Sequence, residues 1–130
     1  DCDGRLNAMG VCIGGHLAFR CAFDARVRAS ACFYATDLHK GSLSQGGDDS
    51  LARAEEIRGE LLMVWGQQDP HIPAEGRARI HARLLERRRR FTWHEFNAEH
   101  AFLRDEGPRY DPALARLCYG MVLDLFGRAR

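Results

Sequence analysis

Short apolar segments alternate with amphipathic ones along the chain, and polar turns separate them. Residues 27–34 (VRASACFY) and 60–65 (ELLMVW) are near-continuous apolar runs of strand length, as expected for strands covered on both faces in a parallel sheet. A shorter run, residues 5–11 (RLNAMGV), predicts a strand that ends at a cysteine among glycines. Residues 91–96 (FTWHEF) alternate more, which suits a strand at the edge of a sheet. The pattern therefore predicts four strands.

Three further segments have the composition of helices. Residues 13–23 continue with small and apolar residues, and residues 74–90 carry apolar side chains that suit a partly buried helix. The last helix is the clearest, because Asp111 can cap it and Pro112 occupies its first position. Its predicted apolar face consists of Leu114, Leu117, Cys118, Met121, Val122 and Leu125. Each of these helices follows a predicted strand.

The order of the predicted elements indicates the fold class. Residues 35–50 lack periodicity and predict a loop, and a short helix is possible near residues 50–57. The order strand, helix, strand, loop, strand, helix, strand, helix is typical of an α/β fold with a parallel sheet and right-handed crossovers. A sheet of about four parallel strands with flanking helices leaves two edges. We therefore expect one edge to be open or to be completed by something outside this sequence.

Composition and charge restrict the partners. The chain has 130 residues, 45% of them hydrophobic, and a formal net charge of +1, which is typical of one globular unit and gives no electrostatic argument for a nucleic-acid or membrane partner. No apolar run approaches the ~20 residues that cross a bilayer. Five cysteines, at positions 2, 12, 21, 32 and 118, lack zinc or disulfide spacing, which favours a reducing, cytoplasmic location. The histidines lack the spacing of a metal motif, and no cofactor is expected.

Candidate chemistry gathers where three of the predicted strands end. Gly10, Cys12 and Gly14 have the G-x-C-x-G spacing of a nucleophile elbow, in which a strained strand-to-helix turn displays the nucleophile. Asp69 follows the third strand in WGQQDPHIP, and His100 follows the fourth in FNAEHAFLRDE. Nucleophile, acid and histidine thus occur in the chain order of the α/β-hydrolase triad.

These residue types fit nucleophilic catalysis. A free cysteine is only a few per cent thiolate near neutral pH, so it needs a base beside it. His100 can take or share the thiol proton, and Asp69 can accept a hydrogen bond from the other imidazole nitrogen and fix the orientation of the ring. The backbone N–H of Ile13, at the start of a helix, would face an oxyanion and gain from the helix dipole. The sequence therefore favours Cys12 as a nucleophile.

Three motifs, in this order, closely resemble those of the dienelactone hydrolase family, whose members are also called carboxymethylenebutenolidases. They are GVCIGGHLAFRCA, WGQQDPHIP and HEFNAEHAFLRDEGPRYDPALA, and the resemblance runs over nearly the whole chain. It implies an α/β-hydrolase fold that cleaves lactone or carboxylic ester bonds through an acyl-enzyme, with Cys12 as nucleophile, Asp69 as orienting acid and His100 as general base. It also implies that Arg104 helps to hold a substrate carboxylate and that Tyr34 lies near an aromatic position of the substrate pocket.

The resemblance covers the C-terminal half of the family's domain. Family members are usually nearly twice this length, so residues 1–130 are expected to form a partial α/β-hydrolase domain whose N-terminal half is absent. That half normally supplies four further strands, a second oxyanion donor and a second arginine that binds carboxylates. We therefore expect the chain alone to be a poor catalyst. We also expect the strand at residues 5–11 to be an exposed edge, which invites a homodimer or a complementing N-terminal half.

Two classes of function stay open. The first is a hydrolase that acts on a small-molecule lactone or ester. The second is a non-catalytic or interaction fragment that retains the triad residues by descent and needs a complementing chain or a homodimer. A thiol redox protein would need a CxxC pair, which the sequence lacks. The run from Arg87 to Arg90 is interpreted as a solvated helix end rather than as a nucleic-acid site.

Overall fold

A four-stranded parallel sheet forms the centre of the molecule. The computed structural model describes residues 2–129. The strands are β1 (Leu6–Val11), β2 (Val27–Phe33), β3 (Glu60–Gly66) and β4 (Phe91–Phe96), and they lie in the order β1-β2-β3-β4. Every neighbouring pair is parallel. The prediction of an α/β fold with about four parallel strands is confirmed.

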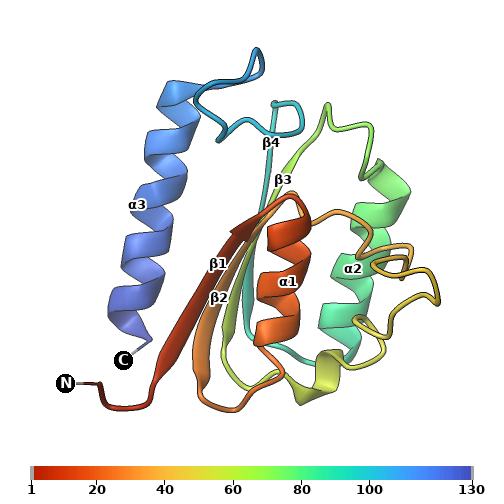
Figure 1. Ribbon diagram of the computed structural model, residues 1–130, viewed down its shortest axis with the longest axis vertical. Coiled ribbons are helices and arrows are strands. Elements are labelled where there is room, and N and C mark those ends of the chain that lie inside the picture. The colour runs from red at the N-terminus through yellow and green to blue at the C-terminus, as the bar shows by residue number, and fades with distance from the viewer. Residues whose placement is uncertain (1, 130) are drawn as a thin grey trace.

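Helices cover both faces of this sheet. Two of them, α1 (Ile13–Cys21) and α2 (Ala74–Glu86), lie on one face, and α3 (Pro112–Arg128) lies on the opposite face (Figure 1). The strands follow one another in one direction across the sheet. Because crossovers between parallel strands are right-handed, the connecting helices α1 and α2 come to the same face. The segment near residues 50–57 contains only a single 3₁₀ turn, η1 (Ala54–Glu56). The fold therefore has three layers, of which the sheet is the middle one.

The helices follow the sequence signals only in part. An Asp111 side-chain oxygen accepts a hydrogen bond from the Leu114 N–H at 2.9 Å, and Pro112 is the first helical residue, as predicted. The first helix ends at Cys21 rather than at residue 23, because the next two N–H groups bond to carbonyls three residues back in tight turns. Leu117 was expected on the apolar face of α3 but is 52% exposed. The buried side of α3 is made by Ala115, Cys118, Val122 and Leu125.

The two central strands carry most of the core. All but one residue of β2 are buried, as are all but the first residue of β3. Trp65 of β3, Phe33 of β2 and Phe19 of α1 are each at most 1% exposed. Their near-continuous apolar sequences therefore reflect coverage on both faces, as expected for central parallel strands.

The outer strand β1 is an exposed apolar edge. Leu6, Met9 and Val11 are 40–42% exposed, although all three are large apolar residues. The same apolar surface continues into α1, where Ile13 is 54% and Leu17 is 48% exposed. Within residues 2–129, β1 pairs on one side only, with β2. An edge of this kind presents unpaired backbone groups that another strand can join.

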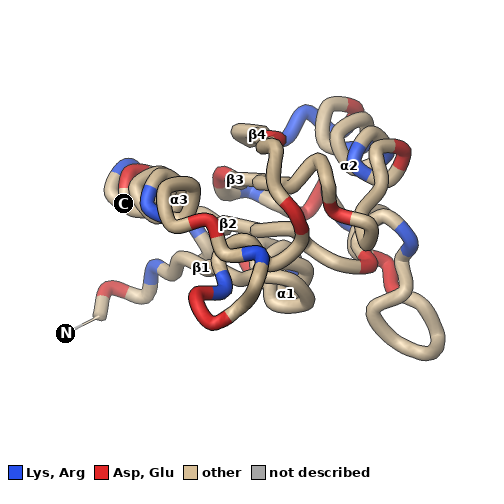
Figure 2. The backbone as a smooth tube through the Cα atoms, turned by 90° about the horizontal axis from the view of Figure 1, so that it is seen from above, with Lys and Arg blue, Asp and Glu red and all other residues tan. Residues whose placement is uncertain are grey.

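Charged residues of both signs are interspersed along the chain (Figure 2). Residues 87–90 were expected to form the solvated end of a helix, but α2 ends at Glu86, and the arginines that follow it reach the segment before β3. The Arg89 guanidinium donates to the carbonyl oxygens of Glu55 (3.2 Å) and Ile57 (2.5 Å), and that of Arg90 donates to Arg58 (3.1 Å). These arginines therefore fix a loop by contacts with its backbone carbonyls.

The described helices include none that is both long and apolar enough to cross a membrane.

Candidate active site

The turn between β1 and α1 holds Cys12 in a strained conformation. Its backbone has φ 58° and ψ −125°, a region that residues with a side chain rarely adopt. A Cβ on Gly10 would lie 1.8 Å from the Gly14 carbonyl oxygen, and a Cβ on Gly15 would lie 2.6 Å from the Phe33 carbonyl oxygen. A Cβ on Gly14 would meet open space. The tight packing of the turn thus depends on Gly10 and Gly15, and not on both glycines of the G-x-C-x-G pattern.

The three predicted triad residues lie together at the carboxyl ends of β1, β3 and β4. The imidazole of His100 has its Nδ1 atom 2.6 Å from Asp69 Oδ2 and its Nε2 atom 3.2 Å from Cys12 Sγ. Asp69 is 4% exposed and His100 is 6% exposed, whereas Cys12 is partly open to solvent. When Nδ1–H donates a hydrogen bond to the carboxylate, Nε2 is left as the acceptor nitrogen that faces the thiol. The arrangement can therefore pass a proton from sulfur to the ring.

The carboxylate of Asp69 is held at both oxygens. Oδ2 faces His100, and Oδ1 accepts a hydrogen bond from the backbone N–H of His71 at 2.8 Å. The turn that carries Asp69 is itself bonded to the loop after β4, because the N–H of Gln68 donates to the carbonyl of Ala98 at 2.9 Å. The acid and the histidine therefore sit on two loops that support each other.

Two aromatic rings lie against the imidazole of His100. The ring centroid of Tyr34 is 5.0 Å away with an interplanar angle of 62°, and that of His71 is 4.6 Å away with an angle of 66°. Tyr34 is 1% exposed, and burial raises the pKa of its hydroxyl to about 12, despite a backbone hydrogen bond from Leu103 that acts in the opposite direction. The structure thus packs the Tyr34 ring edge-to-face against the imidazole. Its predicted contact with substrate stays a prediction.

Ile13 and Arg104, the remaining predicted site residues, lie at the surface. Ile13 is the first residue of α1, and no carbonyl within residues 2–129 accepts a hydrogen bond from its N–H. Arg104 is exposed, and its N–H donates to the carbonyl of Ala101 in the loop that carries His100. Both groups are available to a ligand, and their roles stay predictions.

A buried histidine that the sequence did not single out ties the long loop after β2 to α1. His16 is fully buried, with Nδ1 2.8 Å from the carbonyl oxygen of Thr36 and Nε2 2.6 Å from Ser50 Oγ. The N–H of Thr36 donates to the carbonyl of Cys12 at 3.3 Å. His16 therefore helps to hold Thr36 against the turn that carries Cys12. His71 was missed too, and in both cases the only sequence signal was nearness to Cys12 or Asp69.

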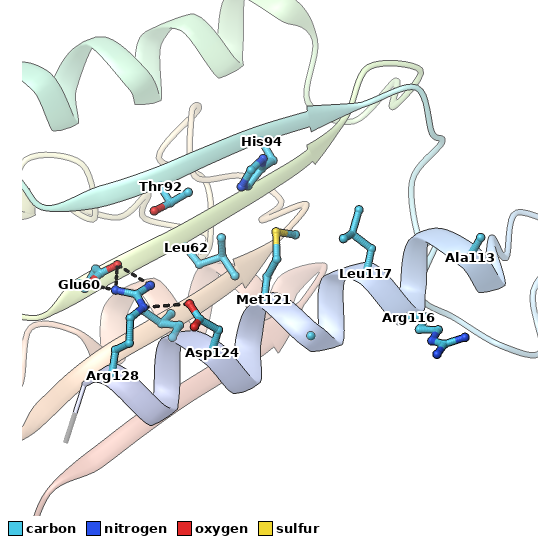
Figure 3. Close-up of a pocket in the computed structure, with 12 residues that line it drawn as sticks. Glu60, Leu62, Thr92, His94, Ala113, Arg116, Leu117, Met121, Asp124 and Arg128 are labelled. Atoms are coloured by element: carbon cyan, nitrogen blue, oxygen red, sulfur yellow. Dashed lines mark hydrogen bonds and ion pairs between the residues drawn. The ribbon is translucent and has the colours of Figure 1, made fainter.

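A groove of about 660 Å³ lies elsewhere, between α3 and the part of the sheet formed by β3 and β4 (Figure 3). Leu62, Met121 and Leu117 line its middle, and the guanidinium of Arg128 bridges Glu60 and Asp124 at one end. None of the three triad residues lines it. The groove and the candidate site are therefore separate features.

A parallel sheet whose first strand runs into a strained cysteine turn, with an acid and a histidine after the later strands, defines the C-terminal half of an α/β-hydrolase fold. The chain belongs to the dienelactone hydrolase family, whose family model matches residues 1–130.

Relatives of known name agree with this assignment. A Saccharomyces cerevisiae protein named "Putative carboxymethylenebutenolidase" is 39% identical over 134 residues, which cover 97% of this chain and 49% of the relative. The carboxymethylenebutenolidase of Pseudomonas sp. (strain P51) is 25% identical over 129 residues, which cover 99% and 50%. The chain thus spans about half the length of the curated relatives it matches.

A solved structure supports the fold. The crystal structure of a "Putative Dienelactone Hydrolase" from Klebsiella pneumoniae matches with a TM-score of 0.86 at 21% sequence identity, over 95% of this chain and 52% of that one. At this identity the likeness concerns the arrangement of strands and helices.

Proposed function

We propose that the chain carries the nucleophilic site of a hydrolase of the dienelactone hydrolase type, which cleaves lactones or carboxylic esters through an acyl-enzyme on Cys12. The observation that supports this best is the continuous contact from Asp69 through His100 to the sulfur, at 2.6 and 3.2 Å. The small-molecule ester substrate follows from the family. No cofactor is needed for this chemistry.

The proposed reaction has two steps. The Cys12 thiolate attacks the carbonyl carbon, a C–S bond forms, the C–O bond to the leaving alkoxide breaks, and His100 gives that alkoxide its proton. His100 then takes a proton from water, the hydroxide attacks the thioester, and the thiolate leaves. Asp69 keeps the proton-bearing Nδ1 turned away from the sulfur and stabilises the imidazolium.

Stabilisation of the oxyanion is the weak point of the isolated chain. Ile13 offers one backbone N–H at the start of α1, where the helix dipole assists. In α/β-hydrolases the second donor comes from a loop after an earlier strand, and the sheet of the described residues begins with the elbow strand. Loss of one oxyanion donor typically lowers turnover by about 10² to 10³. We therefore propose that residues 1–130 alone hydrolyse esters slowly.

Two further residues take supporting roles in this proposal. Arg104 is exposed in the loop of His100 and would hold a carboxylate of the substrate. Tyr34 would act through the imidazole, since it is buried against His100. A reducing compartment such as the cytoplasm suits a free thiol nucleophile, and all five cysteines are free.

The proposal is tested by hydrolysis of p-nitrophenyl acetate. The wild-type chain should release nitrophenolate slowly but continuously, C12A should lose this sustained release, and C21A should match the wild type because Cys21 is an exposed cysteine outside the site. Equal rates for the wild type and C12A would contradict the role of Cys12. Turnover at ordinary enzymatic rates would instead contradict the proposed weakness of the isolated chain.

A second candidate function is an interaction fragment, and the exposed edge of β1 favours it. Large apolar side chains and unpaired backbone groups share this edge, and it could pair with a second copy or with the N-terminal half of a family member. Sedimentation velocity over a wide concentration range should detect a dimer, and a monomer at the highest concentration would contradict self-association. Labelling of Cys12 without any turnover would favour the fragment over the enzyme.

A further inference from the structure

His71 lies directly beside the candidate general base. Its ring centroid is 4.6 Å from that of His100, with an interplanar angle of 66°. This is the edge-to-face geometry in which ring pairs are favourable. We infer that His71 is a positioning residue, whose ring holds the imidazole of His100 in line with Cys12. The inference rests on the proposed function, in which His100 activates the thiol.

The backbone of His71 already has a place in the site, and its ring adds a second contact. The N–H of His71 donates to Asp69 Oδ1 at 2.8 Å, while the other carboxylate oxygen faces His100. One turn after β3 thus contacts the imidazole twice, through the carboxylate at Nδ1 and through the His71 ring. The first contact fixes a nitrogen, and the second restricts the swing of the ring plane.

The two aromatic neighbours of His100 differ in their own support. Tyr34 is 1% exposed and is packed against Phe102, so the core fixes it. His71 is exposed, and its ring nitrogens form no hydrogen bond with any described residue. The side chain of His71 therefore contributes little to the fold. Its contact with the imidazole of His100 is what connects it to the site.

The loop of His100 gives a reason why such a contact is needed. Ala101, the next residue, has φ 63°, a left-handed conformation that is sterically unfavourable for a residue with a Cβ. A triad works only when its groups stay within about 0.5 Å of the productive geometry. A ring on the outer side of the imidazole limits its motion without relying on that strained backbone.

The test follows alkylation of Cys12 by iodoacetamide at pH 7, quantified by mass spectrometry of the Cys12 peptide, with the exposed Cys21 as internal reference. H71A should slow Cys12 alkylation about threefold to tenfold, the range that corresponds to loss of one edge-to-face pair. H71F, which keeps a ring but no nitrogen, should restore the rate to within about twofold of the wild type. Both variants keep the backbone N–H, so Asp69 is unaffected.

Two controls separate the possible failures. H81A removes a ring that has edge-to-face contacts with Phe91 and Trp93, away from the site, and should leave Cys12 alkylation unchanged. H100A should be slower than every His71 variant. If wild type and H100A react equally, the proposed function itself fails. If H100A is slow but H71A matches the wild type, or if H71F is as slow as H71A, the positioning role is wrong.

Discussion

The Nε2 atom of His100 lies 3.2 Å from the sulfur of Cys12, although the two residues are 88 positions apart in sequence and two strands separate β1 from β4 in the sheet. The loop after β4 reaches back across the ends of β3 and β2 to make this contact. Asp69, after β3, lies on the way and bonds to the same ring. The contact therefore exists only while the strand order and the elbow are intact.

The elbow predicts opposite effects of alanine at two of its glycines. G10A should lower the free energy of unfolding by about 2 kcal/mol or more, because its Cβ would overlap the Gly14 carbonyl at 1.8 Å and overpacking of this kind costs about 1 to 3 kcal/mol. G14A should be neutral or stabilising by up to about 1 kcal/mol, since its Cβ meets open space in a helix. Urea unfolding of both variants measures the difference, and equal destabilisation would contradict the described packing.

The residue after His100 predicts a stabilising substitution. Ala101 has φ 63°, which glycine adopts at no steric cost, so A101G should raise the free energy of unfolding by about 0.5 to 1 kcal/mol. The matched substitution A78G lies in the exposed part of α2 and should lower it by about 1 kcal/mol. Thermal unfolding compares them. A loss of stability in A101G would contradict the positive φ of Ala101.

The buried hydroxyl of Tyr34 predicts a loss of stability at alkaline pH. Burial raises its pKa from 10.0 to about 12 in the folded chain, so the unfolded chain loses the proton first. The stabilisation is present below pH 10 and is lost as the pH rises from 10 to 12, by roughly 2 to 3 kcal/mol. Y34F keeps the ring against His100 and should remove this part of the slope.

Two buried thiols limit what Y34F can do. Burial raises the pKa of Cys118 to about 11 and that of Cys32 well above its usual range. Both thiols should therefore leave a residual slope that begins near pH 9 in Y34F. Urea unfolding from pH 8 to 11.5 under reducing conditions tests this, and identical slopes in Y34F and wild type would contradict the burial of the hydroxyl.

Most of the fold could be predicted from the sequence, because each buried strand has its own apolar pattern. The apolar runs of β2 and β3 are long enough to need cover on both faces, and Asp111 with Pro112 marks the start of α3. The exposure of Leu117 could not be foreseen, because periodicity gives the direction of a side chain but not whether a groove opens beside it. The same limit applies to the arginines after α2, whose carbonyl partners come from a loop without periodicity.

The candidate site, too, could be predicted from the sequence only in part. Cys12, Asp69 and His100 could be placed together because parallel strands bring their carboxyl ends to one edge of the sheet. The rings around His100 could not, because Tyr34 and His71 face it only through the local geometry of two turns. The need for Gly10 and Gly15, rather than Gly14, depends in the same way on distances to carbonyl oxygens.

Substitution of Asp69, the acid of the proposed triad, should lower the reactivity of Cys12 and leave the site folded. D69N keeps the size of the side chain but removes the charge that faces His100 Nδ1 and favours the wrong tautomer. It should slow acylation of Cys12 at least about tenfold, whereas D105N, an exposed substitution in the following loop, should not change it. Acylation by p-nitrophenyl acetate at pH 7, followed by mass spectrometry of the Cys12 peptide, gives both rates. A wild-type rate in D69N would remove the acid from the mechanism.

Trapping the acyl-enzyme tests most directly whether the sulfur of Cys12 becomes acylated with His100 as its base. Brief exposure of the 130-residue chain to p-nitrophenyl acetate, followed by acid quenching and peptide mass spectrometry, should find a single acetyl group on Cys12 in the wild type and almost none on that residue in H100A. An acetyl group that appears on Cys12 equally in both proteins, or only at other side chains, would contradict the account.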